Sequence, residues 1–289
     1  MKVDYVFILA AGKGSRMGEI GKKVPKVLWP IFEKSLLELQ VAYAKYLAPS
    51  AKIYINIYNY KTSLLEFIDR NQASFKDVCF IVEESTLDIG GAIHNLANKN
   101  DYKGVSLILN SDQFLFCEKE IISQALKNLN NFAHTLFSYD VLTSQGYNAL
   151  QVRDDCLQGI TINKDITNQK VISTYTGMSL INFENLSVQP GESRFFDSVA
   201  TCKTQRIGVE KILNFEYWDF GTSRRYYEAM FKILKDSTST FLEFLINENA
   251  INPELIGENS YNGLEGITLA EFSLNKGQIS YLDNVDLID

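Results

Sequence analysis

The sequence predicts an α/β fold: a Rossmann-like, doubly wound, mostly parallel mixed sheet with helices on both faces. Short apolar segments typical of buried strands alternate with segments that are apolar at helical spacing. This alternation is typical of a parallel sheet built from strand–helix–strand units. Two of the apolar segments end in polar loops, 12–18 and 110–112. In a doubly wound sheet both loops would face one crevice at the carboxyl ends of the strands.

The expected elements follow in chain order. Strands are expected at residues 3–10, 52–58, 78–82 and 105–109, with helices at 36–47, 63–71 and 91–98. After Phe132 the pattern is richer in strands, expected at 135–139, 149–152, 159–163 and 171–182, which would extend the sheet and cover the crevice. Helical patterns resume at 194–202 and 223–234. Residues 1–235 are therefore expected to form the main domain.

Residues 236–289 are expected to form a small C-terminal α+β extension. A helix is predicted at 240–248, and a hairpin of 267–274 and 278–282 turns at 275–277. No hexapeptide period is visible in this segment, so a left-handed repeat is not expected.

Composition excludes several classes of protein. The net charge of −7 argues against a nucleic-acid partner, so an anionic ligand needs a local cationic site. Such a site is formed by Lys13, Arg16, Lys22, Lys23 and Lys26. The four cysteines show no metal-type or redox pairing, and no segment suggests a signal peptide or a membrane span. We therefore expect a cytoplasmic protein with no membrane partner.

The glycine-rich loop after the first strand suits a polyphosphate. Gly12 allows a tight turn and Gly14 a close approach of the backbone, while Arg16 offers a planar fork and Lys26 a point charge. Gly18 comes one residue too late for a dinucleotide-binding loop, and the pattern of a P-loop is absent. The alternative is a solvated turn, which the ordered succession of Arg16 and the Pro25–Lys26 pair disfavours.

Two aspartates are candidate metal ligands. Asp112 ends an apolar strand, and Asp219 precedes a helix for which Thr222 is the expected N-cap. Mg²⁺ is typically held by one or two carboxylates together with substrate phosphates. The alternative for each is an aspartate that merely ends a strand or occupies a turn.

The segments LAAGKGSRMG and VPKVL resemble the signature LAAGxGxRLxPLTxxxPKPL of the sugar-1-phosphate nucleotidylyltransferases. The resemblance covers about residues 1–235 and is nearest to the N-acetylmuramate-1-phosphate uridylyltransferases and the mannose- and heptose-1-phosphate guanylyltransferases. It implies a nucleotide-diphospho-sugar transferase fold and the transfer of a nucleoside monophosphate from an NTP to a sugar 1-phosphate, with release of pyrophosphate. It also implies that Arg16 steadies the pyrophosphate, that Lys26 binds the α-phosphate, and that Asp112 and Asp219 hold Mg²⁺. The implied catalytic residues are Arg16, Lys26 and Asp112. The implied nucleotide-binding residues of the loop are Leu9, Ala10, Ala11, Gly12, Lys13, Gly14, Ser15 and Arg16.

Two further segments resemble the family more loosely. Residues 83–92 resemble the segment that wraps the nucleobase, which implies nucleotide contacts from Glu83, Gly90 and Gly91, although Thr86 and Ile89 depart from the family pattern. A glycine pair at a helix start is the alternative. On the sugar side the resemblance implies contacts from Asn110, Asn148, Thr176 and Gly177, while the family's E-K-P motif is replaced by residues 163–165.

Several functions remain open at this level. The first expectation is UTP with a cell-envelope amino sugar 1-phosphate, and the second is GTP with a mannose or heptose 1-phosphate. A CTP-using phosphocholine-type cytidylyltransferase, a catalytically silent nucleotide-binding regulator and a nicotinamide-dependent dehydrogenase are the alternatives. A homo-oligomeric state stays open. His94 and His134 lie in ordinary helix and strand patterns, and core or surface roles are expected for them rather than catalysis.

Overall fold

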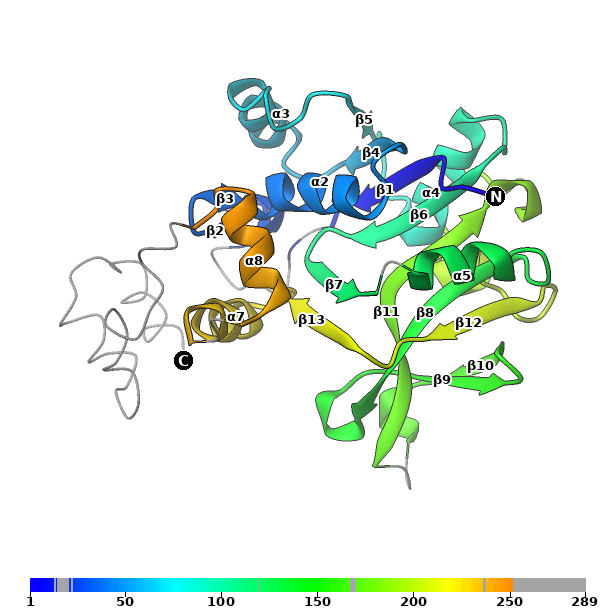
Figure 1. The fold of residues 1–289 in the computed structure, drawn as a ribbon. Helices are drawn as coiled ribbons and strands as arrows, with labels where there is room; N and C mark the ends of the chain where they lie inside the picture. The colour runs from blue at the N-terminus through cyan, green and yellow to red at the C-terminus, as the bar shows by residue number, and fades with distance from the viewer. Residues whose placement is uncertain are drawn as a thin grey trace.

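A computed structural model describes residues 1–12, 14, 21, 23–118, 120–166, 170–235 and 238–251. Its main sheet has nine strands (Figure 1). In spatial order these are β5 (Val78–Val82), β4 (Lys52–Ile57), β1 (Tyr5–Leu9), β6 (Val105–Asn110), β11 (Val171–Asn182), β8 (His134–Leu142), β12 (Ile207–Lys211), β10 (Cys156–Thr161) and β9 (Ala149–Arg153). The strands β5, β4, β1 and β6 are parallel, β12 is parallel to β8, and β11, β10 and β9 pair antiparallel to their neighbours.

Alternating residues of β1 face two separate hydrophobic cores, because successive side chains of a strand point to opposite faces. Val6 and Ile8 join one core and Phe7 joins the other. The first core includes residues of α2 (Leu36–Leu47), α3 (Lys61–Arg70), α5 (Glu120–Asn128), α7 (Ser223–Lys235) and α8 (Thr240–Asn247). The second includes residues of α4 (Asp88–Lys99) and α6 (Phe195–Ser198). The predicted α/β fold, with helices on both faces of a mixed sheet, is therefore confirmed.

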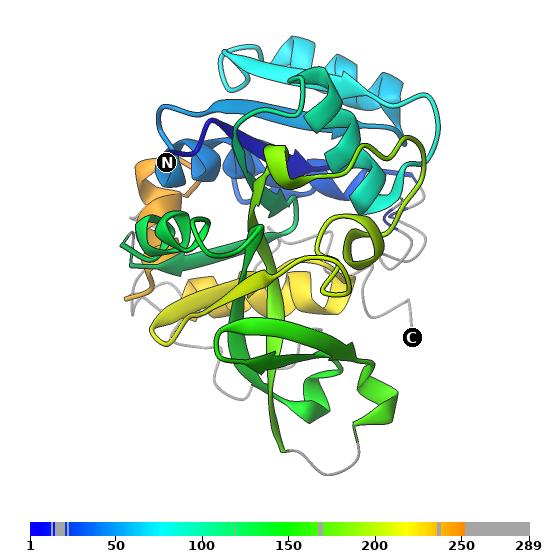
Figure 2. The ribbon, with the colours of Figure 1, turned by 90° about the vertical axis from the view of Figure 1, so that its right-hand side faces the viewer.

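Two small sheets lie beside the main one. The first pairs β7 (Gln113–Cys117) with β13 (Phe215–Asp219), and the second pairs β2 (Pro30–Ile31) with β3 (Lys34–Ser35). Short 3-10 helices are η2 (Lys26–Leu28), η3 (Thr143–Gln145), η4 (Asn163–Asp165) and η5 (Phe183–Asn185). Viewed from the side in Figure 2, β9 and β10 extend away from the rest of the fold as a separate lobe.

Helix α2 joins the small sheets to the core. It begins at a capping box, in which the Ser35 hydroxyl accepts from Glu38 N and the Glu38 carboxylate accepts from Ser35 N. Further along the helix, the buried Tyr43 hydroxyl donates to Leu115 O and accepts from Leu115 N at 3.1 Å. Since β7 pairs with β13 on its other side, this hydroxyl satisfies backbone groups on the edge of β7 that faces α2.

Several elements differ from those predicted. The helix predicted at 194–202 is only the four-residue α6, and the strands β7, β12 and β13 and helix α5 were not anticipated. Helix α8 matches the prediction for 240–248, and its Phe241 and Leu245 are fully buried in the same core as α2. The predicted hairpin at 267–282 lies outside the described residues.

No helix in the described ranges has both the length and the apolar character needed to cross a bilayer. The four cysteines, all in the described ranges, are free. His94 and His134 are both buried, so of the core and surface roles left open by the sequence the core one applies.

Candidate active site

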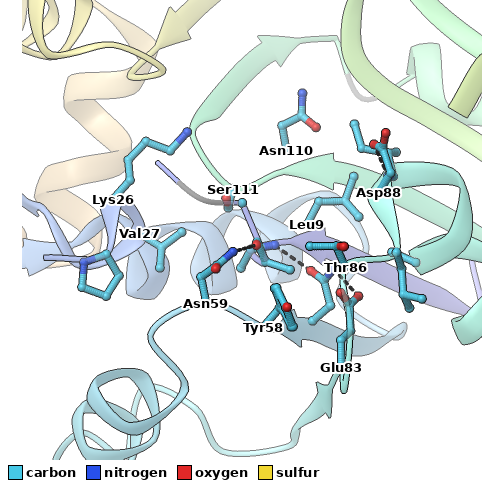
Figure 3. Close-up of a pocket in the computed structure, with 18 of the residues that line it drawn as sticks. Leu9, Lys26, Val27, Tyr58, Asn59, Glu83, Thr86, Asp88, Asn110 and Ser111 are labelled. Atoms are coloured by element: carbon cyan, nitrogen blue, oxygen red, sulfur yellow. Dashed lines mark hydrogen bonds between the residues drawn. The ribbon is translucent and has the colours of Figure 1, made fainter. Parts of the chain in front are cut away.

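A cavity of about 440 Å³ opens at the carboxyl ends of β1, β4, β5 and β6 (Figure 3). Both polar loops singled out in the sequence reach its wall, as the doubly wound fold requires. The lining residues are 9–12, 25–27, 56, 58–60, 64, 83, 86–89, 92, 110–113 and 192.

The start of the glycine loop is held by two asparagines, Asn56 near the end of β4 and Asn59 in the β4–α3 connection. The buried Asn56 accepts from Ala10 N at 2.7 Å, and Asn59 donates to Ala11 O at 2.9 Å. Asn56 also donates to Glu83 Oε1 at 2.8 Å, so it ties the loop after β1 to the end of β5. Two backbone groups and one carboxylate on the cavity wall are therefore held in place by two amide side chains.

Glu83 is a buried carboxylate on the cavity wall. Burial raises the pKa of Glu83, and the hydrogen bond from Asn56 opposes that shift only in part. Burial thus destabilises the negatively charged form of Glu83, and a hydrogen-bond donor on a ligand would stabilise that form.

Lys26 reaches the edge of the cavity from η2. It follows the buried Pro25, and its ammonium group forms an ion pair with Asp112 Oδ2. The segment after η2 is anchored to α7, where Tyr226 donates to Pro30 O and its ring packs edge-on against Trp29 at 5.1 Å between centroids. Lys26 is therefore positioned between the buried Pro25 before it and the packed Trp29 after it.

The pairing of β7 with β13 brings Asp112 and Asp219 together. Asp219 is the register partner of Gln113, and Phe220 N donates to Asp112 O at 2.8 Å. A Cβ atom built on Gly221 would lie 2.8 Å from Asp219 Oδ1 and 3.1 Å from Asp112 Oδ2. The two carboxylates, more than a hundred residues apart in sequence, thus flank one glycine.

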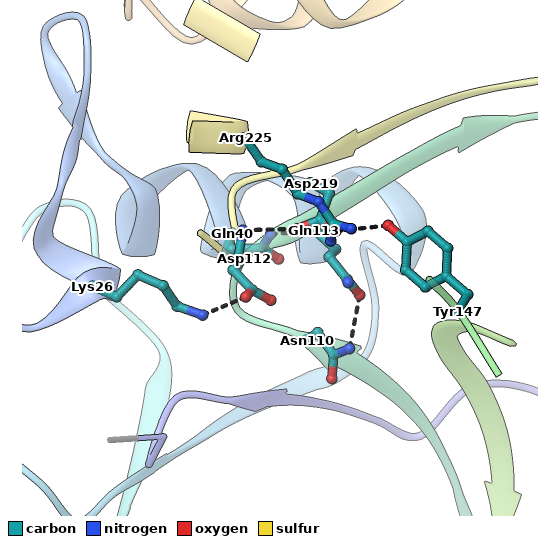
Figure 4. A network of polar contacts seen from close by, with 9 residues as sticks. Lys26, Gln40, Asn110, Asp112, Gln113, Tyr147, Asp219 and Arg225 are labelled. Atoms are coloured by element: carbon teal, nitrogen blue, oxygen red, sulfur yellow. Dashed lines mark hydrogen bonds and ion pairs between the residues drawn. The ribbon is translucent and has the colours of Figure 1, made fainter. Parts of the chain in front are cut away.

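Asp219 has three hydrogen-bond partners in the described chain (Figure 4). Its Oδ2 accepts from Arg225 Nη1 at 2.5 Å and from the Tyr147 hydroxyl at 3.0 Å, and its Oδ1 accepts from Gly221 N at 2.7 Å. Burial and the nearby Asp219 charge raise the pKa of Tyr147 to about 12, so its hydroxyl remains a donor at neutral pH. Thr222 caps α7 as predicted, since its Oγ1 accepts from Arg225 N at 3.2 Å.

The donor set around Gly221 fits Mg²⁺. Two carboxylates at the edge of a cavity of about 440 Å³ match the usual combination of protein oxygens and substrate oxygens around this ion. Within the described residues, no group of three or more His, Cys, Asp or Glu side chains is arranged for a metal. An ion at this position would therefore depend on oxygens from its substrate.

Other predicted site residues lie away from the cavity wall. Gly90 and Gly91, from which nucleotide contacts were expected, do not line this cavity. A Cβ atom on Gly90 would lie 2.4 Å from Ser198 Oγ, and one on Gly91 would lie 2.3 Å from Gly191 O. Both glycines therefore allow α4 to pack closely on a neighbouring segment. The wall is formed instead by 86–89. Lys13, Ser15 and Arg16 lie outside the described residues, whereas Gly14 has a φ of +63°.

The predicted sugar-side residues fall into two groups. Gly177 (φ +87°) faces the amide pair of Asn110 and Gln113, which are 2.7 Å apart, and Thr176 Oγ1 accepts from Met178 N. The exposed Asn148 side chain accepts from Asn163 N at 3.0 Å and so braces the β9–β10 lobe. Its neighbour Tyr147 is the residue that reaches Asp219.

Sequence reasoning did not single out Asn56, Asn59, Gln113, Tyr147 or Arg225. Asn56 interrupts an otherwise apolar strand, and this polar residue in a buried segment was the available signal. Arg225 had a signal too, because the first turn of α7 contains arginines and no acidic residue. Nothing in the sequence connected Tyr147 with Asp219.

Comparisons with known proteins bear on the family and on the fold. A family model described as "Nucleotidyl transferase" matches residues 5–157. The bifunctional protein GlmU of Prochlorococcus marinus is 30% identical over 190 residues, which are 63% of this chain and 40% of GlmU. The GlmU of Methanococcus vannielii is 31% identical over 141 residues, 46% of this chain and 32% of that protein. The chain thus spans less than half the length of these curated relatives.

Two solved structures share the fold. HddC from Yersinia pseudotuberculosis, complexed with GMP-PN, superposes with a TM-score of 0.65 at 20% identity over 80% of this chain and 99% of that one. A UDP-glucose pyrophosphorylase complexed with UDP-glucose gives a TM-score of 0.63 at 17% identity over 81% and 99% of the two chains.

Proposed function

The chain belongs to the nucleotidyl transferase family, and we propose that it transfers a nucleoside monophosphate from an NTP to a sugar 1-phosphate. The observation that carries this proposal is the grouping of Lys26, Asp112 and Asp219 at the edge of a cavity behind a glycine-rich loop. In that reaction an oxygen of the sugar phosphate attacks the α-phosphorus, and the bond to the leaving pyrophosphate breaks. No protein nucleophile is required, so positioning and charge stabilisation carry the catalysis.

Each residue has a defined task in this proposal. Lys26 binds the α-phosphate and exchanges its contact with Asp112 for one with substrate, while Arg16 steadies the pyrophosphate. Asp112 and Asp219 hold Mg²⁺, which would offset the charge of the phosphate oxygens. Asn56 and Asn59 keep the glycine loop open for the triphosphate by holding Ala10 and Ala11.

The first proposed substrate pair is UTP with a cell-envelope amino sugar 1-phosphate, and the protein is proposed to act in the cytoplasm. The second pair is GTP with a mannose or heptose 1-phosphate. The cavity offers the Glu83 carboxylate and the segment 86–89, which includes Thr86 and Asp88, for contacts with a base.

The test is pyrophosphate release with Mg²⁺ across the four common NTPs and a panel of sugar 1-phosphates, with phosphocholine included. One active pair identifies the base and the acceptor together. Turnover by Asp112→Asn and by Lys26→Ala is expected to fall by a factor of at least about 100 while both variants stay folded. NTP binding without release from any pair would favour a nucleotide-binding regulator, and a folded Asp112→Asn variant with near-normal turnover would refute the metal site.

A further inference from the structure

Arg225 occupies an unusual place at the start of α7. Its guanidinium lies 2.5 Å from Asp219 Oδ2, and its Cζ stands 5.0 Å from the centroid of the Tyr147 ring. The Asp219 side chain is only 9% exposed, whereas that of Arg225 is 34% exposed. The arginine thus reaches from solvent to a buried carboxylate, with its plane held by an aromatic ring (Figure 4).

Helix stability does not explain an arginine at this position. The amide N–H groups of the first turn of a helix carry a partial positive charge, so a cation there is unfavourable and an acidic residue is preferred. The backbone N–H of Arg225 is satisfied in that turn, because it donates to Thr222 Oγ1. The side chain is therefore better explained by what it can bind than by the helix.

The charges around Gly221 balance in pairs. Lys26 forms an ion pair with Asp112, and Arg225 forms one with Asp219. In the described ranges no other lysine or arginine forms an ion pair with either carboxylate. Lys26 lines the cavity that would receive the NTP, whereas Arg225 and Tyr147 stand outside its lining, beyond Asp112 and Gln113. A second phosphate-bearing substrate that approaches the carboxylates from this side would meet Arg225.

We propose that Arg225 binds the phosphate of the acceptor and holds it beside the two carboxylates. This inference rests on the proposed function. A guanidinium has five N–H donors in a rigid fork. Arg225 donates to Asp219 from one nitrogen, Nη1, so its other donors can bind two phosphate oxygens while that contact persists. The Tyr147 ring, whose centroid is 5.0 Å from Arg225 Cζ, helps to hold the guanidinium in position by a cation–π contact.

The chain offers a matched control one residue away. Arg224 is 88% exposed and pairs with Glu228 on the outer face of α7. Arg224→Gln and Arg225→Gln therefore remove the same charge from the same helical turn, but only the second removes it from Asp219. Arg225→Lys keeps a charge for Asp219 and loses the bidentate fork. Tyr147→Phe keeps the ring and removes one hydrogen bond from Asp219.

The experiment measures the KM of each substrate for the wild type and the four variants, with the pair that gives turnover and with N-acetylglucosamine 1-phosphate as the first acceptor tried. Arg225→Gln is expected to raise the acceptor KM by about tenfold or more, because a charge-assisted bidentate contact is lost, and to leave the NTP KM within about twofold. Arg225→Lys should give an intermediate acceptor KM, and Arg224→Gln should match the wild type. Tyr147→Phe loosens Asp219 and should lower kcat, but it keeps Arg225 and the ring beside it, so its acceptor KM should rise much less than that of Arg225→Gln.

An unchanged acceptor KM in a folded Arg225→Gln variant would overturn the inference and leave the proposed function standing. An equal rise in Tyr147→Phe would also overturn it, since loosening of Asp219 would then explain the effect. A wild type that turns over no pair would instead overturn the proposed function itself.

Discussion

Gly221 lies between the two carboxylates, so a methyl group at this position is expected to separate them. The added Cβ of Gly221→Ala would lie 2.8 Å from Asp219 Oδ1 and 3.1 Å from Asp112 Oδ2. Ordinary carbon–oxygen contacts are about 3.3–3.6 Å, so each oxygen must move by several tenths of an ångström. Neither carboxylate moves freely, because Asp219 is held by Arg225 and Tyr147, and Asp112 is held by Lys26. Since site geometry must hold within about 0.5 Å and a 1 Å displacement can cost about 100-fold, we expect kcat to fall about 10- to 100-fold.

The assay is pyrophosphate release over a titration of Mg²⁺, with thermal unfolding to confirm that the variant is folded. Gly159→Ala is the matched control. Its Cβ would lie 2.9 Å from Gln151 Oε1, the end of an exposed and flexible side chain, so accommodation is cheap and activity should be unchanged. A folded Gly221→Ala variant with the kcat and Mg²⁺ dependence of the wild type would refute the claim that both carboxylates are fixed around this glycine.

Two further predictions, which use three substitutions, test the scaffold by urea and thermal unfolding. Tyr43→Phe would leave the N–H and C=O of Leu115 unpaired. It should lower the free energy of unfolding by about 1–3 kcal/mol for each group left unsatisfied. The control, Tyr54→Phe, loses one hydrogen bond to Asn100 and should lower the free energy of unfolding by about 1 kcal/mol. Equal effects of the two would contradict the role of Tyr43 at the edge of β7. Burial raises the pKa of Glu83 in the folded state, so its contribution to stability is present at low pH and is lost as the pH rises through the folded pKa. Glu83→Gln should therefore match the wild type near pH 4 and be the more stable protein at pH 7, and a stability difference independent of pH would exclude this explanation.

The parallel half of the fold was predictable because its signals are local. Strands β1, β4, β5 and β6 are short, mostly apolar segments, and α2 matches its prediction residue for residue. Helix α2 has a capping box at its start and an Ala48–Pro49 stop at its end. Each of these signals lies within a few residues of the element that it specifies.

The missed strands have no such local signal. Strands β7 and β13 are rich in aromatic residues, but each is defined by its pairing with the other, about a hundred residues away. Their side chains enter a cluster of rings around Phe114 and Phe241, 4.9 Å apart between centroids. A pairing of this kind is decided by tertiary packing, which outweighs the propensity of either segment alone.

The candidate site divides in the same way. Lys26, Asp112 and Asp219 could be named from motifs, and the structure brings the three together. What the sequence could not supply is how they are held: Asn56 under the loop, Tyr147 and Arg225 on Asp219, and Gly221 between the carboxylates. These contacts join segments that approach one another only after the sheet has formed.

One turn of α7 links the two halves of the site. Arg225 pairs with Asp219, and the adjacent Tyr226 bonds to Pro30 O and packs on Trp29, in the segment that follows Lys26. A rotation of this turn would therefore change the contact of Arg225 with Asp219 and, at the same time, the contacts of Tyr226 with the segment that follows Lys26. The position of the turn depends in turn on α8, because Phe241 packs against Trp218 at 5.1 Å and Phe220 at 6.0 Å, on either side of Asp219. Helix α8 is thus part of the support of the candidate site, because its Phe241 packs on the residues before and after Asp219.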